Sequence, residues 1–380
     1  MRLEDICTVF TDGDWIESKD QSDEGIRLVQ TGNIGKGIYL EKEARAKYIS
    51  EDTFEKLKCT EIFPGDILVS RLPEPVGRAC IIPDKEERMI TAVDCTICRP
   101  DETVISKEYL CYFMRSNAYY TRLLGSVTGT TRKRISRKNL GNVELDVPSR
   151  EKQNEVVEQL DHLVNVIDSK TRELQLLDDL IQARFVEMFG DPVQNTKGWN
   201  IDTCKNLTSK IGSGATPKGG RESYGTEGIS LIRSMNVYNN RFEYKDLAYI
   251  TDEQADKLSN VTIEENDVLL NITGASVARC CAVPKELIPA RVNQHVAIVR
   301  CKDRLLPEFL CSMFTEDSYQ RLLWSIATSG GATREAITKQ QIEDLVLIVP
   351  PIELQQQFVD FCKQVNKLKL ATSPQTTLAA

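Results

Sequence analysis

Arginine, asparagine and glutamine side chains recur on predicted loops in both halves of this 380-residue chain. Their planar end groups carry hydrogen-bonding atoms in pairs: arginine matches the major-groove edge of guanine, and asparagine or glutamine matches that of adenine. With the lysines and the threonine beside them, they are the residues most suited to chemistry in the sequence. The candidates for DNA contact are Gln30, Arg71, Arg78, Arg132, Lys133 and Arg134 in the first half, and Lys218, Arg233, Asn271, Thr273, Arg279, Gln294 and Arg334 in the second.

Some of these candidates lie in the densest basic run of the chain, which places five positive charges within the seven residues that begin at Arg132. Such a run can neutralise several phosphates, which gives affinity that depends on salt. The alternative is the solvated start of a helix. The counterpart in the second half, Thr333-Arg334-Glu335, is weakly charged. We therefore expect the two halves to hold DNA unequally.

The net charge of −8 excludes a uniformly basic DNA-binding protein. It leaves room for a local basic face, or for protein partners that supply much of the phosphate contact.

The sequence segments that come nearest to catalytic motifs each lack a required residue. The chain's Pro-Pro pair, in Val349-Pro-Pro-Ile352, lacks the Asp or Asn before it and the aromatic residue after it that adenine methyltransferases use. Gly220 stands where a phosphate-binding loop requires lysine. His162 falls within a heptad helix, and His295 is a poor candidate for a catalytic triad. We expect no catalytic residues, although the abundant acidic residues leave a nuclease carboxylate cluster open.

Twelve cysteines are scattered along the chain, and one pair, Cys95-Thr-Ile-Cys98, has the spacing of half a zinc site. The pair lies in a strand-like stretch, where residues three apart point to opposite faces. No second such pair follows. We expect buried, reduced thiols and no metal.

An internal repeat organises the whole chain. Gly65–Val69 returns 201 positions later as Asn266–Leu270, and Arg78–Pro83 returns at the same separation as Arg279–Pro284. Five further pairs of segments keep the same order with separations between 199 and 203. They begin at Gly25 and Gly228, Tyr109 and Phe309, Arg122 and Arg321, Thr131 and Thr333, and Val147 and Val349. This order indicates a duplicated domain. Arg78 and Arg279 hold equivalent positions, so a structural or phosphate-contacting role is the alternative for both.

Each copy has the pattern of an α+β domain. Short apolar or alternating runs at 66–71, 79–83 and 94–99 predict strands, and 107–115 and 118–124 predict short helices.

A long helix follows each copy. Residues 151–189 contain neither glycine nor proline, and apolar residues recur at every seventh position. The seam residues are Leu160, Ile167, Leu174, Ile181 and Met188 in the first helix, and Phe358, Phe361 and Val365 in a shorter second helix. The two helices can form an antiparallel intramolecular coiled coil with approximate twofold symmetry. The alternative is that they dimerise the chain with itself or another protein.

The predicted boundaries are a first domain at 1–148, a central helix at 149–192, a second domain at 193–349, a second helix at 350–370 and a disordered tail at 371–380. The N-terminus shows no secretory signal and no apolar run approaches the ~18 residues that a membrane span needs. We expect a cytoplasmic protein with no membrane association.

Taken together, these segments resemble the specificity subunit of Type I restriction–modification systems. The segments Lys210–Lys218 and Asp267–Gly274, with Asn293-Gln-His295, resemble a target-recognition domain. The run from Gly331 to Gln355 resembles the exit into the second conserved helix, and Phe185–Pro192 resembles the end of the central helix. The resemblance covers nearly the whole chain, through motifs that are specific only as an ordered, duplicated set.

The resemblance implies a non-catalytic chain whose two domains each read one half of a bipartite, asymmetric double-stranded DNA target. It implies that the helices bind two methyltransferase subunits and, in the full complex, restriction subunits that translocate DNA. S-adenosylmethionine and ATP would bind those partners, and no cofactor would bind this chain. One departure is that the second helix ends near Leu370 without a counterpart of Phe189–Pro192, which puts the completeness of both partner-binding surfaces in doubt.

Two other functions stay open. One is a scaffold of two protein-binding domains without a DNA role, which the negative charge favours. The other is a self-sufficient modification enzyme, which the missing methyltransferase motif disfavours. Under the first interpretation the helices set the gap in the target. One extra turn in both would add about 5.4 Å, or one to two base pairs, and leave the half-sequences unchanged.

Overall fold

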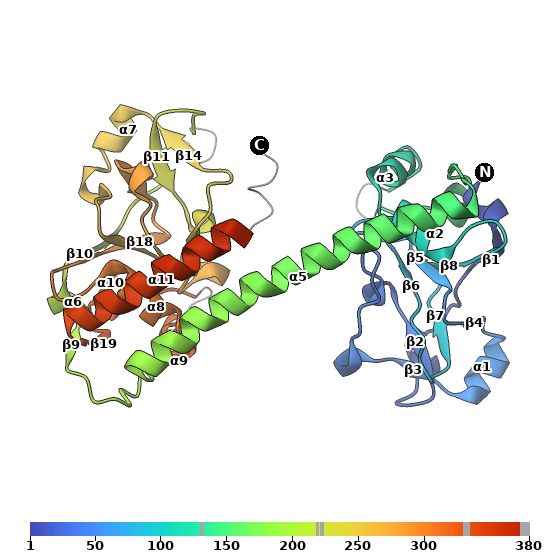
Figure 1. Cartoon of the computed structure of the whole chain (residues 1–380), viewed down its shortest axis with the longest axis horizontal. Helices are drawn as coiled ribbons and strands as arrows, with labels where there is room; N and C mark the ends of the chain where they lie inside the picture. The colour runs from blue at the N-terminus through green and yellow to red at the C-terminus, as the bar shows by residue number, and fades with distance from the viewer. Residues whose placement is uncertain (130–132, 218–219, 221–223, 330–334, 373–380) are drawn as a thin grey trace. The chain divides into compact units, whose positions relative to one another are not determined.

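The structure is a computed structural model that describes residues 1–129, 133–217, 220, 224–329 and 335–372. The chain divides into two compact units, Met1–Asp168 (unit 1) and Ser169–Ala380 (unit 2), and the boundary falls within one long helix (Figure 1).

Unit 1 contains eight strands and four short helices within its described residues, followed by the first part of α5. The strands are β1 (Cys7–Asp12), β2 (Ile26–Val29), β3 (Tyr48–Ile49), β4 (Glu61–Ile62), β5 (Ile67–Ser70), β6 (Ala79–Ile81), β7 (Met89–Thr91) and β8 (Cys95–Pro100). The helices are α1 (Glu51–Leu57), α2 (Lys107–Phe113), α3 (Asn117–Leu124), α4 (Arg137–Gly141) and α5 (Arg150–Phe189).

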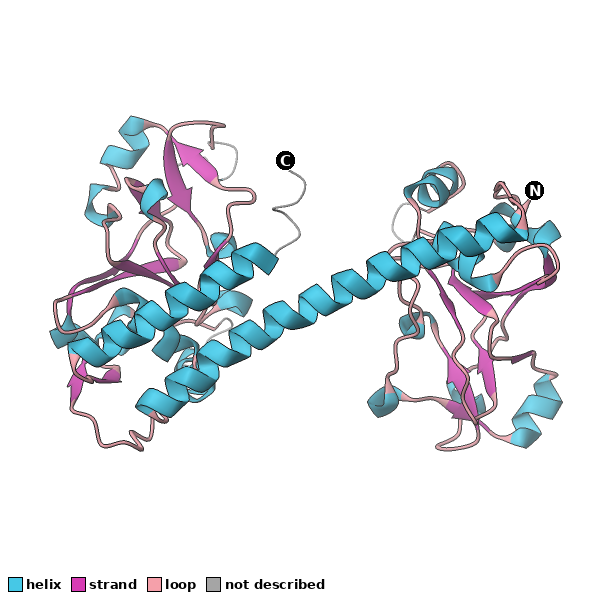
Figure 2. Cartoon of the chain, viewed as in Figure 1, coloured by secondary structure: helices cyan, strands magenta, loops and turns pink. Residues whose placement is uncertain are grey.

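Unit 2 holds the end of α5 and a second set of strands and helices (Figure 2). The strands are β9 (Ile201–Thr203), β10 (Thr208–Ser213), β11 (Ile229–Ile232), β12 (Val237–Tyr238), β13 (Arg241–Phe242), β14 (Ala248–Ile250), β15 (Asp267–Asn271), β16 (Cys280–Ala282), β17 (Ala290–Val292), β18 (Val296–Cys301) and β19 (Val346–Ile348). The helices are α6 (Cys204–Leu207), α7 (Asp252–Asp256), α8 (Pro307–Thr315), α9 (Asp317–Thr328), α10 (Lys339–Glu343) and α11 (Ile352–Thr372).

Both units contain the same main sheet. Unit 1 has the antiparallel order β1-β8-β5-β6, and unit 2 has β10-β18-β15-β16. Each unit also has a second sheet in which a parallel pair, β2 with β7 or β11 with β17, joins an antiparallel edge strand, β3 or β14. Even the irregular register in the first strand pair recurs, between Cys7 and Val9 and between Thr208 and Lys210. The predicted duplication and the α+β class are confirmed.

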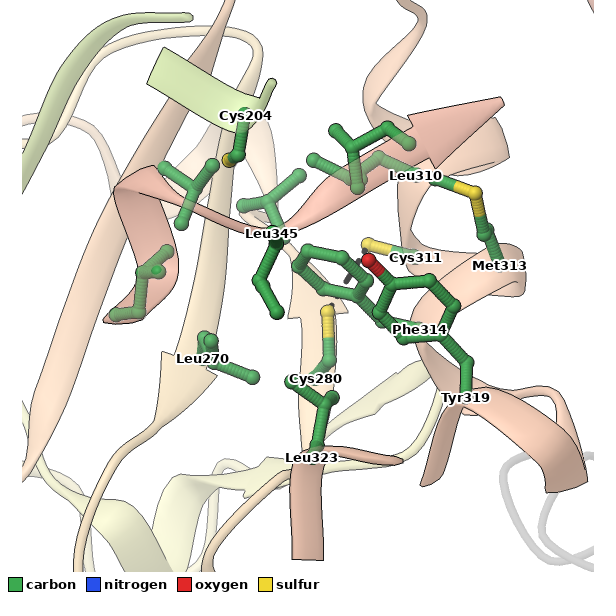
Figure 3. Packing of buried hydrophobic residues seen from close by; sticks show 14 of the residues in the cluster. Cys204, Leu270, Cys280, Leu310, Cys311, Met313, Phe314, Tyr319, Leu323 and Leu345 are labelled. Atoms are coloured by element: carbon green, nitrogen blue, oxygen red, sulfur yellow. Dashed lines mark hydrogen bonds between the residues drawn. The ribbon is translucent and has the colours of Figure 1, made fainter. Parts of the chain in front are cut away.

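The main sheets are buried on both faces, which explains their nearly continuous apolar runs. In β5, Ile67 and Val69 pack in a cluster with residues of α2 and α3, whereas Leu68 packs in a cluster with the second sheet. The period of two follows from the pleat of a strand. In β15, Val268 and Leu269 divide in the same way between the two clusters of unit 2. Figure 3 shows the cluster that contains Val268, where Cys280 lies near Phe314 and Tyr319.

The cysteine pair with metal-like spacing is buried, as the sequence predicts. Cys95 and Cys98 are buried on opposite faces of β8, and neither forms a disulfide. Among the described residues, no group of three His, Cys, Asp or Glu side chains is placed to hold a metal ion.

A buried glutamine joins each long helix to the domain before it. Gln153 of α5 accepts a hydrogen bond from the Ser106 amide (2.8 Å) and donates to the carbonyls of Val104 (3.0 Å) and Pro148 (2.9 Å). Gln355 of α11 repeats this pattern in unit 2, with one acceptor contact and two donor contacts to backbone groups. Both side chains are fully buried.

Helix α11 packs antiparallel to the last part of α5. The paired residues are Phe189 with Phe358, Arg184 with Phe361, Asp178 with Lys369, and Glu173 with Thr372. Residue numbers fall along one helix as they rise along the other, so the predicted antiparallel arrangement is confirmed for this stretch.

Only part of the predicted seam is covered by this pairing. Phe358 and Val365 are buried, and Ile181 and Met188 pack against the core of unit 2. Leu160, Leu174 and Phe361 are half-buried, but Ile167 is 55% exposed. The reason is length: α5 has 40 residues and α11 has 21, so α11 ends opposite Glu173.

The boundary predicted for the C-terminal tail is wrong by two residues. Ala371 and Thr372 continue α11 instead of starting a disordered tail, and residues 373–380 lie outside the described part. Alanine favours helix, which is consistent with the extension of α11 through Ala371.

None of the helices in the described part of the chain has the length and apolar character that crossing a membrane requires.

Candidate nucleic-acid interface

In unit 2, three polar loops meet at one end of the main sheet. Strand β18 runs antiparallel to both β10 and β15, with Ser213 opposite Ala297 and Asn271 opposite Val296. The loops that leave β10 and β15 therefore lie beside the loop that enters β18. We call this place the unit 2 sheet end; it comprises Thr216, Thr273, Gln294 and His295.

These four side chains form one chain of hydrogen bonds. The Thr216 hydroxyl donates to Gln294 Oε1, Gln294 Nε2 lies 3.0 Å from His295 Nε2, and His295 Nδ1 lies 2.6 Å from Thr273 Oγ1. Gln294 itself is exposed at the surface. The loop is further held by a 3.0 Å bond from the His295 amide to the Asn293 side chain.

The same end of the main sheet in unit 1 carries charged groups, and we call it the unit 1 sheet end. Its residues are Asp12, Arg71, Asp94, Arg134 and Arg137. Arg134 Nη2 lies 3.0 Å from Asp94 Oδ1, and Arg71 Nε lies 3.4 Å from Asp12 Oδ1. Arg137 Nη1 lies 3.9 Å from Asp12 Oδ2, and Arg71, Arg137 and Asp12 line one surface pocket. Arg71 is buried, which lowers the pKa of its guanidinium, whereas Arg134 and Arg137 are exposed.

The repeat makes the two sheet ends directly comparable. Ile135 donates its amide to the Arg71 carbonyl, and Ile337 does so to the Ile272 carbonyl. The Arg71 amide binds the Asp94 carbonyl, as the Ile272 amide binds that of His295. The positions of Arg71, Asp94 and Arg134 in unit 1 are therefore those of Ile272, His295 and Ala336 in unit 2. The same end of the main sheet therefore carries charged side chains in unit 1 and mostly uncharged polar side chains in unit 2.

A close approach of two backbone segments shapes both sheet ends. Gly13 follows β1, and a Cβ there would lie 2.3 Å from the Thr91 carbonyl oxygen. Gly214 follows β10, and a Cβ there would lie 1.7 Å from the Val292 carbonyl oxygen. Only glycine allows the loop to leave the strand at this point.

Besides Arg71, two further predicted DNA contacts are buried, and they hold loops in place. The Arg78 guanidinium donates to the carbonyls of Thr31 and Ile34 (both 2.7 Å) and of Leu72 (2.8 Å). The Asn271 amide donates to the Ser234 carbonyl at 2.9 Å. Arg78 thus connects the turn after β2 to the main sheet of unit 1, and Asn271 connects the turn after β11 to the main sheet of unit 2. Both side chains therefore have a positioning role.

The remaining described candidates are exposed or half-buried and take no part in these networks. Gln30 is exposed at the start of the turn 31–33, and Lys133 is exposed beside Arg134. Arg233 is half-buried, with its guanidinium carbon 5.4 Å from the centre of the Tyr224 ring. Arg279 stacks in the same way on Tyr238 at 4.5 Å, so it does not share the buried role of Arg78. Arg132, Lys218 and Arg334 fall outside the residues that the structure describes.

The sequence does not identify every member of the sheet ends. Asp12 and Asp94 are not among the candidates for DNA contact. Arg137 enters only as part of the basic run, and Thr216 and His295 are linked to DNA only within segments that resemble a target-recognition domain. The repeat could have identified Asp94 and His295 as equivalent positions, because they are 201 residues apart, which is also the separation of the repeated segments around them.

Known proteins are similar to this chain over nearly its whole length. The chain is 21% identical to a Methanocaldococcus jannaschii protein named as the specificity subunit of the type I restriction enzyme MjaX, over 96% of this chain and 86% of that protein. A chain from a solved type I R-M system has a TM-score of 0.57 at 18% identity, and the match covers 98% of this chain and 92% of that one. The S subunit of the Type-I restriction-modification system from M. genitalium has a TM-score of 0.53 at 11% identity, covering 98% and 90%.

A family model decides the assignment. The model of the Type I restriction modification DNA specificity domain matches residues 1–178 and again residues 197–377, one match for each copy of the repeat. This chain belongs to the family of the Type I restriction modification DNA specificity domain.

Proposed function

We propose that this chain is the DNA-recognition subunit of a Type I restriction–modification complex, and that each unit reads one half of a bipartite, asymmetric target. The observation that carries the proposal is the pair of sheet ends. Equivalent loops present arginine and aspartate in unit 1, but threonine, glutamine and histidine in unit 2. Two equivalent surfaces with different hydrogen-bonding groups are suited to two different half-sequences.

The negative net charge fits a division between specificity and affinity. Phosphate contacts supply most of the affinity for DNA, and base contacts supply the sequence preference. Lys133, Arg134 and Arg137 form a local basic surface in unit 1. We propose that methyltransferase subunits, bound to α5 and α11, supply the remaining phosphate contacts.

Catalysis and cofactor binding belong to the partners in this proposal. S-adenosylmethionine binds the methyltransferase subunits and ATP binds the restriction subunits, in the cytoplasm. This chain contributes recognition and the spacing between the two half-sites.

A salt-titrated binding measurement tests the proposal. The chain is co-purified with a methyltransferase subunit from its host, and binding to duplexes from the host genome is followed by fluorescence anisotropy. We expect one split sequence, with a constant gap, to bind at least ~10³-fold more tightly than random DNA.

A Lys133→Ala variant examines the basic surface, and Lys56→Ala, an exposed lysine of α1, is its matched control. The first should weaken binding to all sequences alike and reduce the slope of log K against log salt by about 0.9. Equal binding to all duplexes by the unaltered complex would favour the scaffold function instead.

A further inference from the structure

The hydrogen-bond chain at the unit 2 sheet end fixes the direction of every proton along it. The Thr216 hydroxyl donates to Gln294 Oε1, so the amide nitrogen of Gln294 faces His295. An amide nitrogen only donates, so His295 Nε2 accepts. The imidazole proton then lies on Nδ1, and it is donated to Thr273 Oγ1 over 2.6 Å.

This arrangement leaves the Gln294 amide with one unused donor and one unused acceptor. The amide has two N–H groups and two oxygen lone pairs. His295 takes one N–H and Thr216 takes one lone pair. Glutamine pairs with adenine by donating one N–H to N7 and accepting one from N6. The remaining pair of groups is what adenine requires, and Gln294 is exposed to a ligand.

We propose that Gln294 reads an adenine in the half-site bound by unit 2, and that Thr216, His295 and Thr273 are positioning residues that hold its amide in one orientation. The proposal rests on the function proposed above. None of the four side chains carries a full charge when the imidazole is neutral, so this place is suited to a base edge more than to phosphate.

The equivalent place in unit 1 would not read adenine in this way. There the position of Gln294 is taken by Val93 and that of Thr273 by Leu72, while Asp94 holds the exposed Arg134 at 3.0 Å. The adenine preference that depends on Gln294 is therefore confined to one half of the target.

The test is a binding selection on randomised duplexes with the chain in complex with its methyltransferase subunit. The variant is Gln294→Glu, which keeps the shape of the side chain but removes the donor. We expect one adenine position in one half-site to lose its preference by roughly 5–150-fold, with cytosine gaining, because a carboxylate accepts from the cytosine amino group. The other half-site and the gap should not change.

A control and a second variant separate this effect from charge and from folding. Gln194→Glu adds the same charge at another exposed glutamine of unit 2 and should leave the preferred sequence unaltered. Thr273→Val removes the hydroxyl that accepts from His295. It should weaken the preference at the same adenine position by a smaller factor, with an unchanged thermal unfolding midpoint.

Three results would overturn the inference. The Gln294→Glu complex could keep every adenine preference, lose affinity equally for all sequences, or change the same half-site that Arg134→Ala changes. If the unaltered complex selects no split sequence, the proposed function fails, and the inference fails with it.

Discussion

Two arginines of this chain show that the type of a side chain does not by itself define its role. Arg78 and Arg134 have the same guanidinium, but Arg78 is buried and bonded to backbone carbonyls, whereas Arg134 is exposed and held by a single carboxylate. A buried arginine can stay charged where carbonyl dipoles replace water. Arg78 therefore stabilises loops, and Arg134 remains available to a ligand.

The buried thiols predict how stability depends on pH. Burial raises the pKa of Cys80 and of Cys95 to about 12 each, and that of Cys111 to about 11. A thiol in the unfolded chain has a pKa of about 8.5. Below that pH both states are protonated and the stabilisation is intact. As the pH rises above it, only the unfolded state loses protons, so folding weakens by up to ~1.4 kcal/mol per pH unit for each thiol until the folded-state pKa is reached.

Urea unfolding of the reduced protein at pH 8, 9 and 10 measures this effect. Cys80→Ala should show a shallower decline than the unaltered chain, and this difference removes the contribution of lysines and tyrosines. Identical slopes for the two proteins would show that Cys80 does not contribute.

At the scale of elements, the glycine after β10 predicts a sharp contrast between two neighbouring substitutions. A Cβ at Gly214 would lie 1.7 Å from the Val292 carbonyl oxygen, whereas one at Gly212 would have no neighbour within 4 Å. Gly214→Ala should therefore displace the loop that carries Thr216, with a loss of about 2–4 kcal/mol in unfolding free energy. Gly212→Ala should change it by less than ~1 kcal/mol. Denaturant unfolding measures both, and equal losses would contradict the steric argument.

The glutamine that joins each long helix to its domain predicts a second contrast. Gln355→Leu would leave one amide and two carbonyls of the backbone without partners in a buried site, at a cost of about 2–5 kcal/mol. Gln356→Leu, at the next position, removes only an exposed contact with Asp360 and should cost about 0.5 kcal/mol or less. Thermal unfolding of the two variants separates them; a similar midpoint for both would mean that α11 is held by its apolar contacts alone.

At the scale of the whole molecule, the proposed function makes α5 the spacer between two readers. Residues 162–172 of α5 lie before Glu173, where α11 ends, so an insertion there leaves the antiparallel pairing with α11 unaltered. Seven extra residues after Ser169 would lengthen the helix by about 10 Å and rotate its continuation by only about 20°.

We expect the target of that variant to keep both half-sequences and to gain about three base pairs in its gap, at 3.4 Å for each step. Binding selection with the methyltransferase complex measures the gap. A variant of unchanged length, with seven exposed residues of α5 replaced by alanine, is the control. Altered half-sequences with an unaltered gap would contradict the spacer role.

The sequence by itself determined the duplication, the strands of the main sheet and the two long helices. The duplication is visible as the same order of segments about 201 positions apart. The strands and helices are visible as two local patterns: a short apolar run in strands such as β5, and a seven-residue repeat in α5. Both local patterns involve residues that are close in the sequence, so they can be recognised without knowledge of distant contacts. The glycine and proline that end α5 are equally local, and Gly190 has the positive φ of +75° that such an end requires.

Only the tertiary structure decided which candidate side chains meet. Arg78 is buried because carbonyls more than 40 residues away, such as that of Ile34, converge on it. Gln294 joins a network because antiparallel strands bring a loop some 80 residues earlier, with Thr216, to the same sheet end. Burial and hydrogen bonding of this kind depend on distant backbone groups, and no pattern among adjacent residues encodes them.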